Sequence, residues 1–206
     1  MVLQEINALV DKAQKPLENK WLDGLYGQVA AFVETRINYY RFLYWLVLDI
    51  HPHFCIELGV EFGIASAYMA LAGRRVGAKV IGIDHNYHDI PGEQIPKYLQ
   101  NYTYVVKDTA NALCDVMRVI RRRGVGIVFQ DSSHHYTASQ TEWNIYRPML
   151  MSGSVWVCDD ILPAFHDAKV DPPGKGMVQY FQSLPGDKML FPDVLNKGNC
   201  VGVVLL

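Results

Sequence analysis

Short apolar runs alternate with longer segments of mixed polarity over most of the chain after residue 50. The runs have the length of β-strands, and the segments between them repeat apolar residues at helical spacing. Strands that alternate with helices are typical of a mostly parallel sheet that helices cover on both faces. We therefore expect strands at 54–58, 79–84, 102–107, 126–130, 154–158, 188–194 and 200–205, and helices at 65–76, 92–100, 110–123, 138–150 and 176–183.

The end of the chain has a different signal. The last two predicted strands are joined through Asn-Lys-Gly-Asn at 196–199, a sequence that favours a turn. Two strands joined in this way form a hairpin, which here is expected to add an antiparallel strand. The predicted fold class is thus α/β: a Rossmann-like, doubly wound, mostly parallel sheet with a C-terminal antiparallel hairpin.

The first part of the chain, 1–50, has a helical pattern throughout. A first helix is amphipathic, with Val2, Ile6, Leu9 and Val10 on one face. A second helix, at 29–49, is apolar on most sides, which is typical of a buried helix. It is expected to pack on the sheet, to cover the ligand site or to form a dimer contact. We predict an N-terminal helical extension at 1–50, a domain at 51–206, and a homo-oligomer.

A glycine turn follows the first predicted strand. Its pattern, Glu57-x-Gly59-x-x-x-Gly63, differs from the Gly-x-Gly-x-x-Gly of dinucleotide-binding proteins. Glycine admits dihedral angles that a Cβ forbids and lets the backbone approach a ligand closely. Because the glycines that seat a pyrophosphate are absent, the expected ligand is a nucleoside without one, and S-adenosylmethionine fits that description.

Acidic residues stand at the carboxyl ends of the first five predicted strands. Like charges at one edge of a sheet repel and raise one another's pKa, so a ligand with donors or a metal ion is expected there. Asp84, roughly 20 residues after the glycine turn, is expected to bind both ribose hydroxyls. Asp108 is expected either to cap a helix or to contact the adenine. The acidic residues are Glu57, Asp84, Asp108, Asp131, Asp159 and Asp160.

Asp131, Asp159 and Asp160 follow two strands that can be neighbours in the sheet. Carboxylate oxygens suit Mg²⁺, Mn²⁺ or Ca²⁺, whereas helix capping is the alternative role for the aspartate pair. His134 comes three residues after Asp131. With an ordinary pKa near 6.5, it is the natural general base for a hydroxyl that a metal polarises.

Together these residues resemble class I S-adenosylmethionine-dependent methyltransferases. Residues 57–63 resemble their motif I, and Asp84 matches their ribose-binding acid. Segments 131–136 and 152–160 are similar to the branch with cephalosporin hydroxylase-like proteins and metal-dependent O-methyltransferases of macrolide sugars. The resemblance implies Mg²⁺ or Mn²⁺ at Asp131, Asp159 and Asp160, with His134 deprotonating the hydroxyl of a small acceptor such as a sugar or polyketide. Asp159 stands where the branch often has glutamate.

The composition of the chain indicates which kinds of partner and which cell compartment to expect. The formal net charge is -2, and the arginine run at 121–123 is interpreted as a helix end, so we expect no nucleic-acid partner. The most apolar helical run is too short and too charged to span a membrane. The four cysteines contain no C-x-x-C pair, and the first residues do not resemble a signal peptide. Reduced thiols and a cytoplasmic location are therefore predicted.

Two alternative functions remain open. In a non-haem iron hydroxylase, Asp131, His134 and Asp160 would imitate a metal triad if His135 also turned inward. That chemistry leaves the glycine turn and Asp84 without a role. The other alternative is a protein that binds S-adenosylmethionine without turnover, which leaves His134 without a role.

Overall fold

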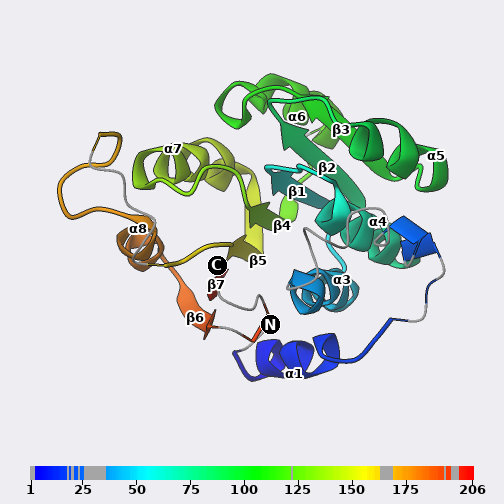
Figure 1. Ribbon diagram of the computed structural model, residues 1–206, viewed down its shortest axis with the longest axis horizontal. Coiled ribbons are helices and arrows are strands. Elements are labelled where there is room, and N and C mark those ends of the chain that lie inside the picture. Colours follow the sequence, from blue (N-terminus) through cyan, green and yellow to red (C-terminus); the bar gives the residue numbers. More distant parts are fainter. Residues whose placement is uncertain are drawn as a thin grey trace.

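A computed structural model describes residues 3–17, 19, 21–22, 24–25, 36–121, 123–162, 169–192, 194–195 and 200–206. Its centre is a seven-stranded sheet with the strand order β3-β2-β1-β4-β5-β7-β6 (Figure 1). The strands are β1 (Phe54–Leu58), β2 (Lys79–Asp84), β3 (Tyr102–Val106), β4 (Val125–Gln130), β5 (Leu150–Cys158), β6 (Asp187–Pro192) and β7 (Cys200–Leu205).

The pairing of these strands confirms the predicted fold class. β1 pairs in parallel with both β2 and β4, while β7 is antiparallel to β5 and to β6. The strand order therefore reverses between β1 and β4, and ligands of doubly wound folds bind outside the carboxyl ends of the strands at such a point.

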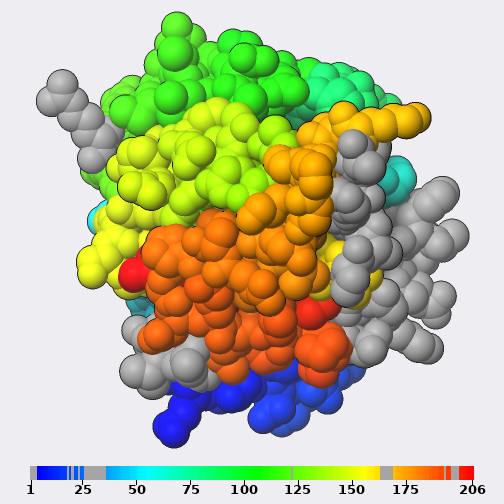
Figure 2. Space-filling model, turned by 90° about the vertical axis from the view of Figure 1, so that its left-hand side faces the viewer, coloured from blue at the N-terminus to red at the C-terminus, as the bar shows by residue number. Residues whose placement is uncertain are grey.

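Helices cover both faces of the sheet. Figure 1 shows α3 and α4 on one side of the central strands and α7 and α8 on the other. Figure 2 shows the second side, where α7 lies against α8. The helices are α1 (Leu3–Ala13), α3 (Ile37–Ile50), α4 (Ile64–Val76), α5 (Ile95–Tyr98), α6 (Leu113–Ile120), α7 (Tyr136–Tyr146) and α8 (Met177–Ser183).

Apolar residues fill both sides because successive residues of a strand face opposite ways. In β1, Cys55 belongs to the core that includes residues of α1, α3 and α4, whereas its neighbour Ile56 belongs to the core that includes residues of α6, α7 and α8. All five residues of β1 are buried, which explains why the strand is apolar except for Glu57. None of the chain's four cysteines forms a disulfide.

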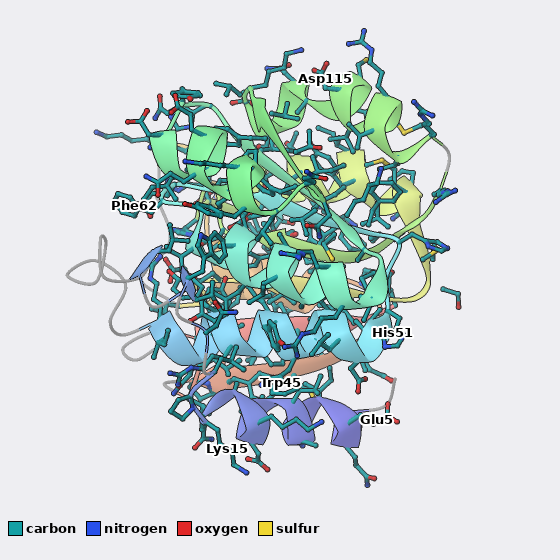
Figure 3. The ribbon with its side chains drawn as sticks, turned by 90° about the vertical axis from the view of Figure 1, so that its right-hand side faces the viewer. Glu5, Lys15, Trp45, His51, Phe62 and Asp115 are labelled. Carbon is teal, nitrogen blue, oxygen red and sulfur yellow. The ribbon has the colours of Figure 1, made fainter. Side chains whose placement is uncertain are left out.

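The N-terminal helices join the first of these cores. α3 packs against α4, and α1 packs against the outer side of α3, where Trp45 points toward it (Figure 3). The ammonium of Lys12 lies 5.6 Å from the Trp45 ring centroid. The predicted division of the chain at residue 50 thus separates elements that share a core. Of the helices that the structure describes, none is long and apolar enough to cross a membrane.

The helix predicted at 92–100 is the clearest difference. Residues Ile90–Gln94 form a π-helical turn instead, and α5 spans only Ile95–Tyr98. Pro91 and Pro96 lack the N–H that a regular helix needs beyond its first turn, which accounts for the short helix.

Smaller differences lie at other helix ends. Short 3₁₀ turns at Thr109–Asn111 and Arg147–Met149 replace one end of two predicted helices. Pro148 lies in the second of these turns. The start of the helix predicted at 29–49 and the turn predicted at 196–199 lie outside the described residues.

Candidate active site

A cavity of about 830 Å³ opens where β1, β2, β3 and β4 end. Its wall also includes Arg36 and Tyr40 from the start of α3, and one side of α7. Asp159 and Asp160 do not line the cavity. The predicted site residues on the wall are Glu57, Gly59, Gly63, Asp84, Asp108, Asp131 and His134.

The glycine turn brings the loops after β1 and β4 together. Gly59 and Gly63 have φ angles of 84° and 74°, in the region where L side chains are strained. A Cβ at Gly59 would also overlap the backbone carbonyl of Asp131. Gly59 is therefore required by the contact between two loops of the protein, besides any contact with a ligand.

Asp84 holds this turn in place. Its Oδ2 accepts hydrogen bonds from the backbone N–H groups of Val60 and Glu61, both at 2.9 Å. Its Oδ1 accepts one from Asn86 N–H at 2.9 Å and lies 3.3 Å from His85 Nδ1. Burial raises the pKa of Asp84, but the three N–H donors and His88 outweigh it, and the pKa is lowered. Because Oδ2 already has two donors, Oδ1 is the oxygen that retains capacity for a ligand.

Glu57 lies beneath the turn at the end of β1. It is 1% exposed and accepts a hydrogen bond from the Ser66 hydroxyl. Burial raises the pKa of Glu57 well above its usual range. A buried carboxyl group on a cavity wall favours a ligand that brings hydrogen-bond donors or positive charge.

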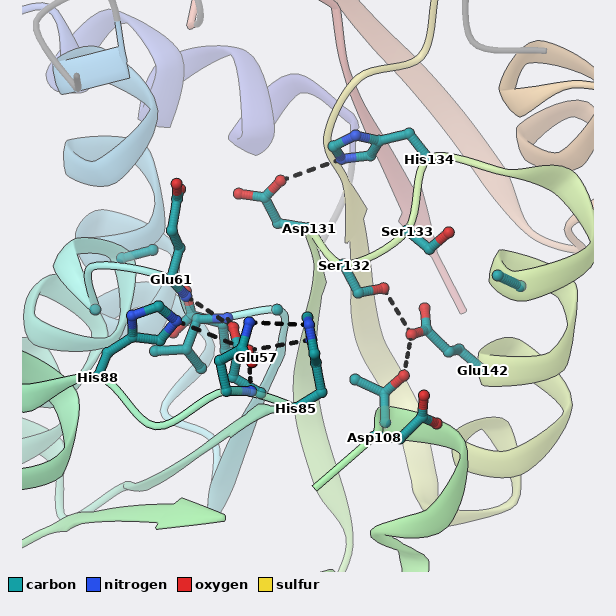
Figure 4. A pocket seen from close by; sticks show the side chains of 18 of the residues that line it. Glu57, Glu61, His85, His88, Asp108, Asp131, Ser132, Ser133, His134 and Glu142 are labelled. Carbon is teal, nitrogen blue, oxygen red and sulfur yellow. Dashed lines mark hydrogen bonds and ion pairs between the residues drawn. The ribbon is translucent and has the colours of Figure 1, made fainter. Parts of the chain in front are cut away.

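His134 connects the acidic residues after β4 and β5. Its Nε2 lies 3.3 Å from Asp131 Oδ1, and its Nδ1 lies 3.1 Å from Asp160 Oδ2. Figure 4 shows the imidazole above Asp131 at the edge of the cavity. Burial lowers the pKa of His134, but Asp131, together with the other two aspartates, raises it overall.

Arg36 adds a permanent positive charge that the sequence did not reveal. Its Nη1 lies 3.9 Å from Asp131 Oδ2, and the charges of Asp131, Asp159 and Asp160 all act on it. It is the only lysine or arginine among the described residues of the cavity wall. We call Arg36, Asp131, His134 and Asp160 the charged end of the cavity.

The predicted metal ligands are only partly brought together. Asp131 and Asp160 share His134, and Asp159 is fully buried beside Asp160. Within the described ranges, no three His, Cys, Asp or Glu side chains are grouped so that they could hold a metal ion. The buried Asp160 Oδ1 nevertheless has no hydrogen-bond partner among the described residues, which is costly unless a cation or a donor binds there.

A second group of residues forms the opposite end, around Glu142 of α7 (Figure 4). Glu142 is 2% exposed and accepts hydrogen bonds from the Thr109 hydroxyl, from Ser132 Oγ at 2.6 Å and from Gln130 Nε2 at 2.7 Å. Burial raises its pKa, whereas these three donors stabilise the ionised form. We call Thr109, Gln130, Ser132 and Glu142 the hydroxyl end.

Gln130 links this end to the core behind it. Its Oε1 accepts hydrogen bonds from Trp156 Nε1 at 3.1 Å and from the Tyr180 hydroxyl at 2.8 Å. Sequence reasoning missed Gln130 and Glu142, although an amide at the end of the apolar run of β4 was a usable signal. Asp108, nearby, caps the turn after β3, with Oδ1 accepting from Ala110 N–H at 2.9 Å.

His135 does not join the charged end. Its Nδ1 lies 3.6 Å from Asp171 Oδ2, so the imidazole is directed toward a different carboxylate from those near His134. The second histidine that an iron triad would require is therefore not supplied by His135.

Comparisons with known proteins identify the family of the chain. A family model described as Methyltransferase domain matches residues 56–161. No curated protein matches the chain significantly.

Solved structures with the same fold cover nearly the whole chain. The O-methyltransferase TomG from Streptomyces achromogenes, involved in tomaymycin synthesis and bound to S-adenosylmethionine, has a TM-score of 0.69 and 14% identity, over 100% of this chain and 99% of that one. An O-methyltransferase from Bacillus cereus in complex with SAH has a TM-score of 0.59 and 12% identity, and the match covers 99% of this chain and 90% of that one. The calicheamicin methyltransferase CalS11 has a TM-score of 0.56 and 15% identity, and the match covers 96% of this chain and 90% of that one.

The resemblance seen in the motifs is thereby confirmed, since the matched residues run from β1 to just beyond β5 and contain the glycine turn and the aspartates after β4 and β5. The chain belongs to the Methyltransferase domain family and has the class I fold of S-adenosylmethionine-dependent methyltransferases.

Proposed function

We propose that the protein transfers the methyl group of S-adenosylmethionine to a hydroxyl group of a small molecule. The observation that carries this proposal is His134, held between Asp131 and Asp160 at the edge of a nucleoside-sized cavity. Two proteins with the same fold have such roles: TomG is an O-methyltransferase involved in tomaymycin synthesis, and CalS11 is a calicheamicin methyltransferase. By analogy we propose an acceptor from natural-product biosynthesis, such as a sugar or a polyketide.

The charges of the cavity support one orientation of the cofactor. Its sulfonium and ammonium groups are positive and suit the side of Asp131 and Glu57, while Arg36 suits its carboxylate. The ribose then lies near Asp84 Oδ1, and the adenine lies at the hydroxyl end. This orientation brings the methyl group near His134, where an acceptor hydroxyl would be deprotonated.

The proposed reaction is a single displacement. The hydroxyl oxygen of the acceptor forms a bond to the methyl carbon while the bond from that carbon to sulfur breaks. The sulfonium becomes the neutral thioether of S-adenosylhomocysteine, and the hydroxyl proton passes to His134. Alignment of oxygen, carbon and sulfur contributes much of the rate, and a positioned base contributes about 10²–10⁴-fold.

We further propose that Asp131, Asp159 and Asp160 hold Mg²⁺ or Mn²⁺. Their hard oxygen donors fit such an ion, and the observation that favours it is Asp160 Oδ1, which has no hydrogen-bond partner within the described ranges. A bound divalent ion would lower the pKa of the acceptor hydroxyl. The homo-oligomer and the cytoplasmic location expected from the sequence remain predictions.

Calorimetry with S-adenosylhomocysteine tests the proposal first, followed by turnover with a panel of hydroxyl acceptors before and after chelation. We expect binding of the cofactor product, and methylation that chelation removes and Mg²⁺ restores. Full activity after exhaustive chelation would reject the metal, and absence of cofactor binding would reject the function itself.

A further inference from the structure

The hydroxyl end of the cavity has used all its side-chain donors within the protein. The hydroxyl hydrogens of Thr109 and Ser132 both go to Glu142. The two amide hydrogens of Gln130 go to Glu142 Oε2 and to the carbonyl of Ser139. A hydroxyl that donates its hydrogen to one partner can only accept from another.

Two backbone N–H groups of the loop after β3 are occupied in the same way. The N–H of Ala110 donates to Asp108 Oδ1, and the N–H of Asn111 donates to the carbonyl of Asp108. The side-chain groups left for a ligand on this wall are therefore the oxygens of Thr109 and Ser132 and the carboxylate of Asp108. This part of the described wall offers acceptors and no side-chain donor.

Glu142 is what fixes this arrangement. A free hydroxyl rotates and serves a donor or an acceptor equally well. When ionised, the carboxylate of Glu142 has no hydrogen to donate and can only accept, so it keeps both hydroxyl hydrogens turned away from the cavity. Its burial and its link through Gln130 to Trp156 and Tyr180 hold that carboxylate in one position.

We propose that Glu142 is a specificity-determining residue that makes the cavity select a nucleobase with an exocyclic amino group. The inference rests on the proposed function, because it takes the base to lie at the hydroxyl end. The 6-amino group of adenine has two N–H donors that match these acceptors. A 6-oxo base such as hypoxanthine places an oxygen acceptor there instead, and facing acceptors leave buried groups without hydrogen bonds.

The test compares S-adenosylhomocysteine with S-inosylhomocysteine, which differs by the exchange of the 6-amino group for an oxo group. We expect the wild-type protein to bind the adenosine compound at least about tenfold more tightly in calorimetry. Glu142→Gln should remove that preference. The new amide can accept from Gln130 and donate to the hydroxyls of Thr109 and Ser132, which frees both hydroxyl hydrogens for the 6-oxo group.

Thr141→Ala is the matched control, since Thr141 is the neighbouring residue of α7, also lines the cavity, and donates to the carbonyl of Thr137. It should keep the wild-type preference. If Glu142→Gln does not fold, Ser132→Ala is used instead. This variant should lower the affinity for the adenosine compound more than the affinity for the inosine compound.

Several results would overturn the proposal. One is a wild-type protein that binds both compounds equally, and another is a Glu142→Gln protein that keeps the preference. If Glu142→Gln lowers the affinity for both compounds equally, the residue has a structural role only. A wild-type protein that binds neither compound would instead reject the proposed function.

Discussion

The two ends of the cavity differ in how completely their polar groups are satisfied. At the hydroxyl end, Glu142 and Gln130 have partners for both oxygens and both amide hydrogens. At the charged end, carboxylates share Arg36 and His134 at 3.1 to 3.9 Å, and Asp160 Oδ1 has no hydrogen-bond partner in the described part of the chain. The side-chain donors of the first end are used within the protein, whereas the second end leaves a carboxylate oxygen that a ligand could bind.

This difference suggests a division of labour. A satisfied buried network makes the fold specific and costs much to disrupt. Clustered buried charges contribute little to the stability of a fold, and such sites often serve function at its expense. We therefore expect substitutions at the hydroxyl end to act mainly on stability and base selection, and those at the charged end to act mainly on binding and turnover.

Gln130→Ala should have the largest effect on stability. It leaves Glu142, the Trp156 N–H and the Tyr180 hydroxyl each short of a buried partner. We expect the free energy of unfolding to fall by about 2–4 kcal/mol in urea denaturation. Gln140→Ala, on the outer part of α7, should change it by less than about 0.5 kcal/mol. If Gln130→Ala lowers the free energy of unfolding by less than about 1 kcal/mol, the hydroxyl end does not have the expected role in stability.

Arg36→Gln should act on binding instead. The guanidinium is the permanent cation of the described wall and the proposed partner of the cofactor's carboxylate. Its charged hydrogen bonds contribute about 1.5–3 kcal/mol, so affinity for S-adenosylhomocysteine should fall at least about tenfold. Affinity for 5′-methylthioadenosine, which lacks the carboxylate, should stay the same. If the affinities for both ligands fall equally, Arg36 does not bind the carboxylate.

Asp84→Asn should lower stability in a way that depends on pH. The folded-state pKa of Asp84 is below its ordinary value, so its ionised form stabilises the fold. That contribution is present above the ordinary pKa and is lost as pH falls through the lowered folded-state pKa. Thermal unfolding should therefore separate the variant from wild type at pH 7, and the gap should close below about pH 4. A constant gap would show that the charge is not involved.

Asp160→Asn should have the smallest effect on stability. Burial raises the pKa of Asp160, so its charge is not favoured by the fold. Its φ angle of 57° is one that asparagine adopts readily. We expect the free energy of unfolding to stay within about 1 kcal/mol of wild type, while turnover is lost. A much larger loss of stability would mean that the charged end supports the fold.

Much of the fold could be predicted from the sequence. β1, β2 and β7 have the predicted limits because strands that helices cover on both faces are mostly apolar. The acids at the strand ends could be predicted as well, since the topology carries Asp84 and Asp131 to one edge of the sheet.

The rest depends on tertiary contacts that no local pattern encodes. Glu142 is one polar residue of a helix with mixed composition, and only the position of α7 beside the loops after β3 and β4 gives it Thr109 and Ser132 as partners. Arg36 likewise comes from a segment far along the chain from Asp131. Asp84 was predicted to bind a ribose, but its bonds to the glycine turn depend on how the two loops meet.

The central claim is that His134 takes the proton of an acceptor hydroxyl during methyl transfer, and one measurement tests it most directly. S-adenosylmethionine with a deuterated methyl group is incubated with a hydroxyl acceptor, and the labelled ether is followed by mass spectrometry for wild type, His134→Ala and His135→Ala. We predict that His134→Ala lowers the rate by about 10²–10⁴-fold with cofactor affinity nearly unchanged, whereas His135→Ala, whose side chain lies beside Asp171, stays near wild type. Wild-type transfer by His134→Ala would contradict the account.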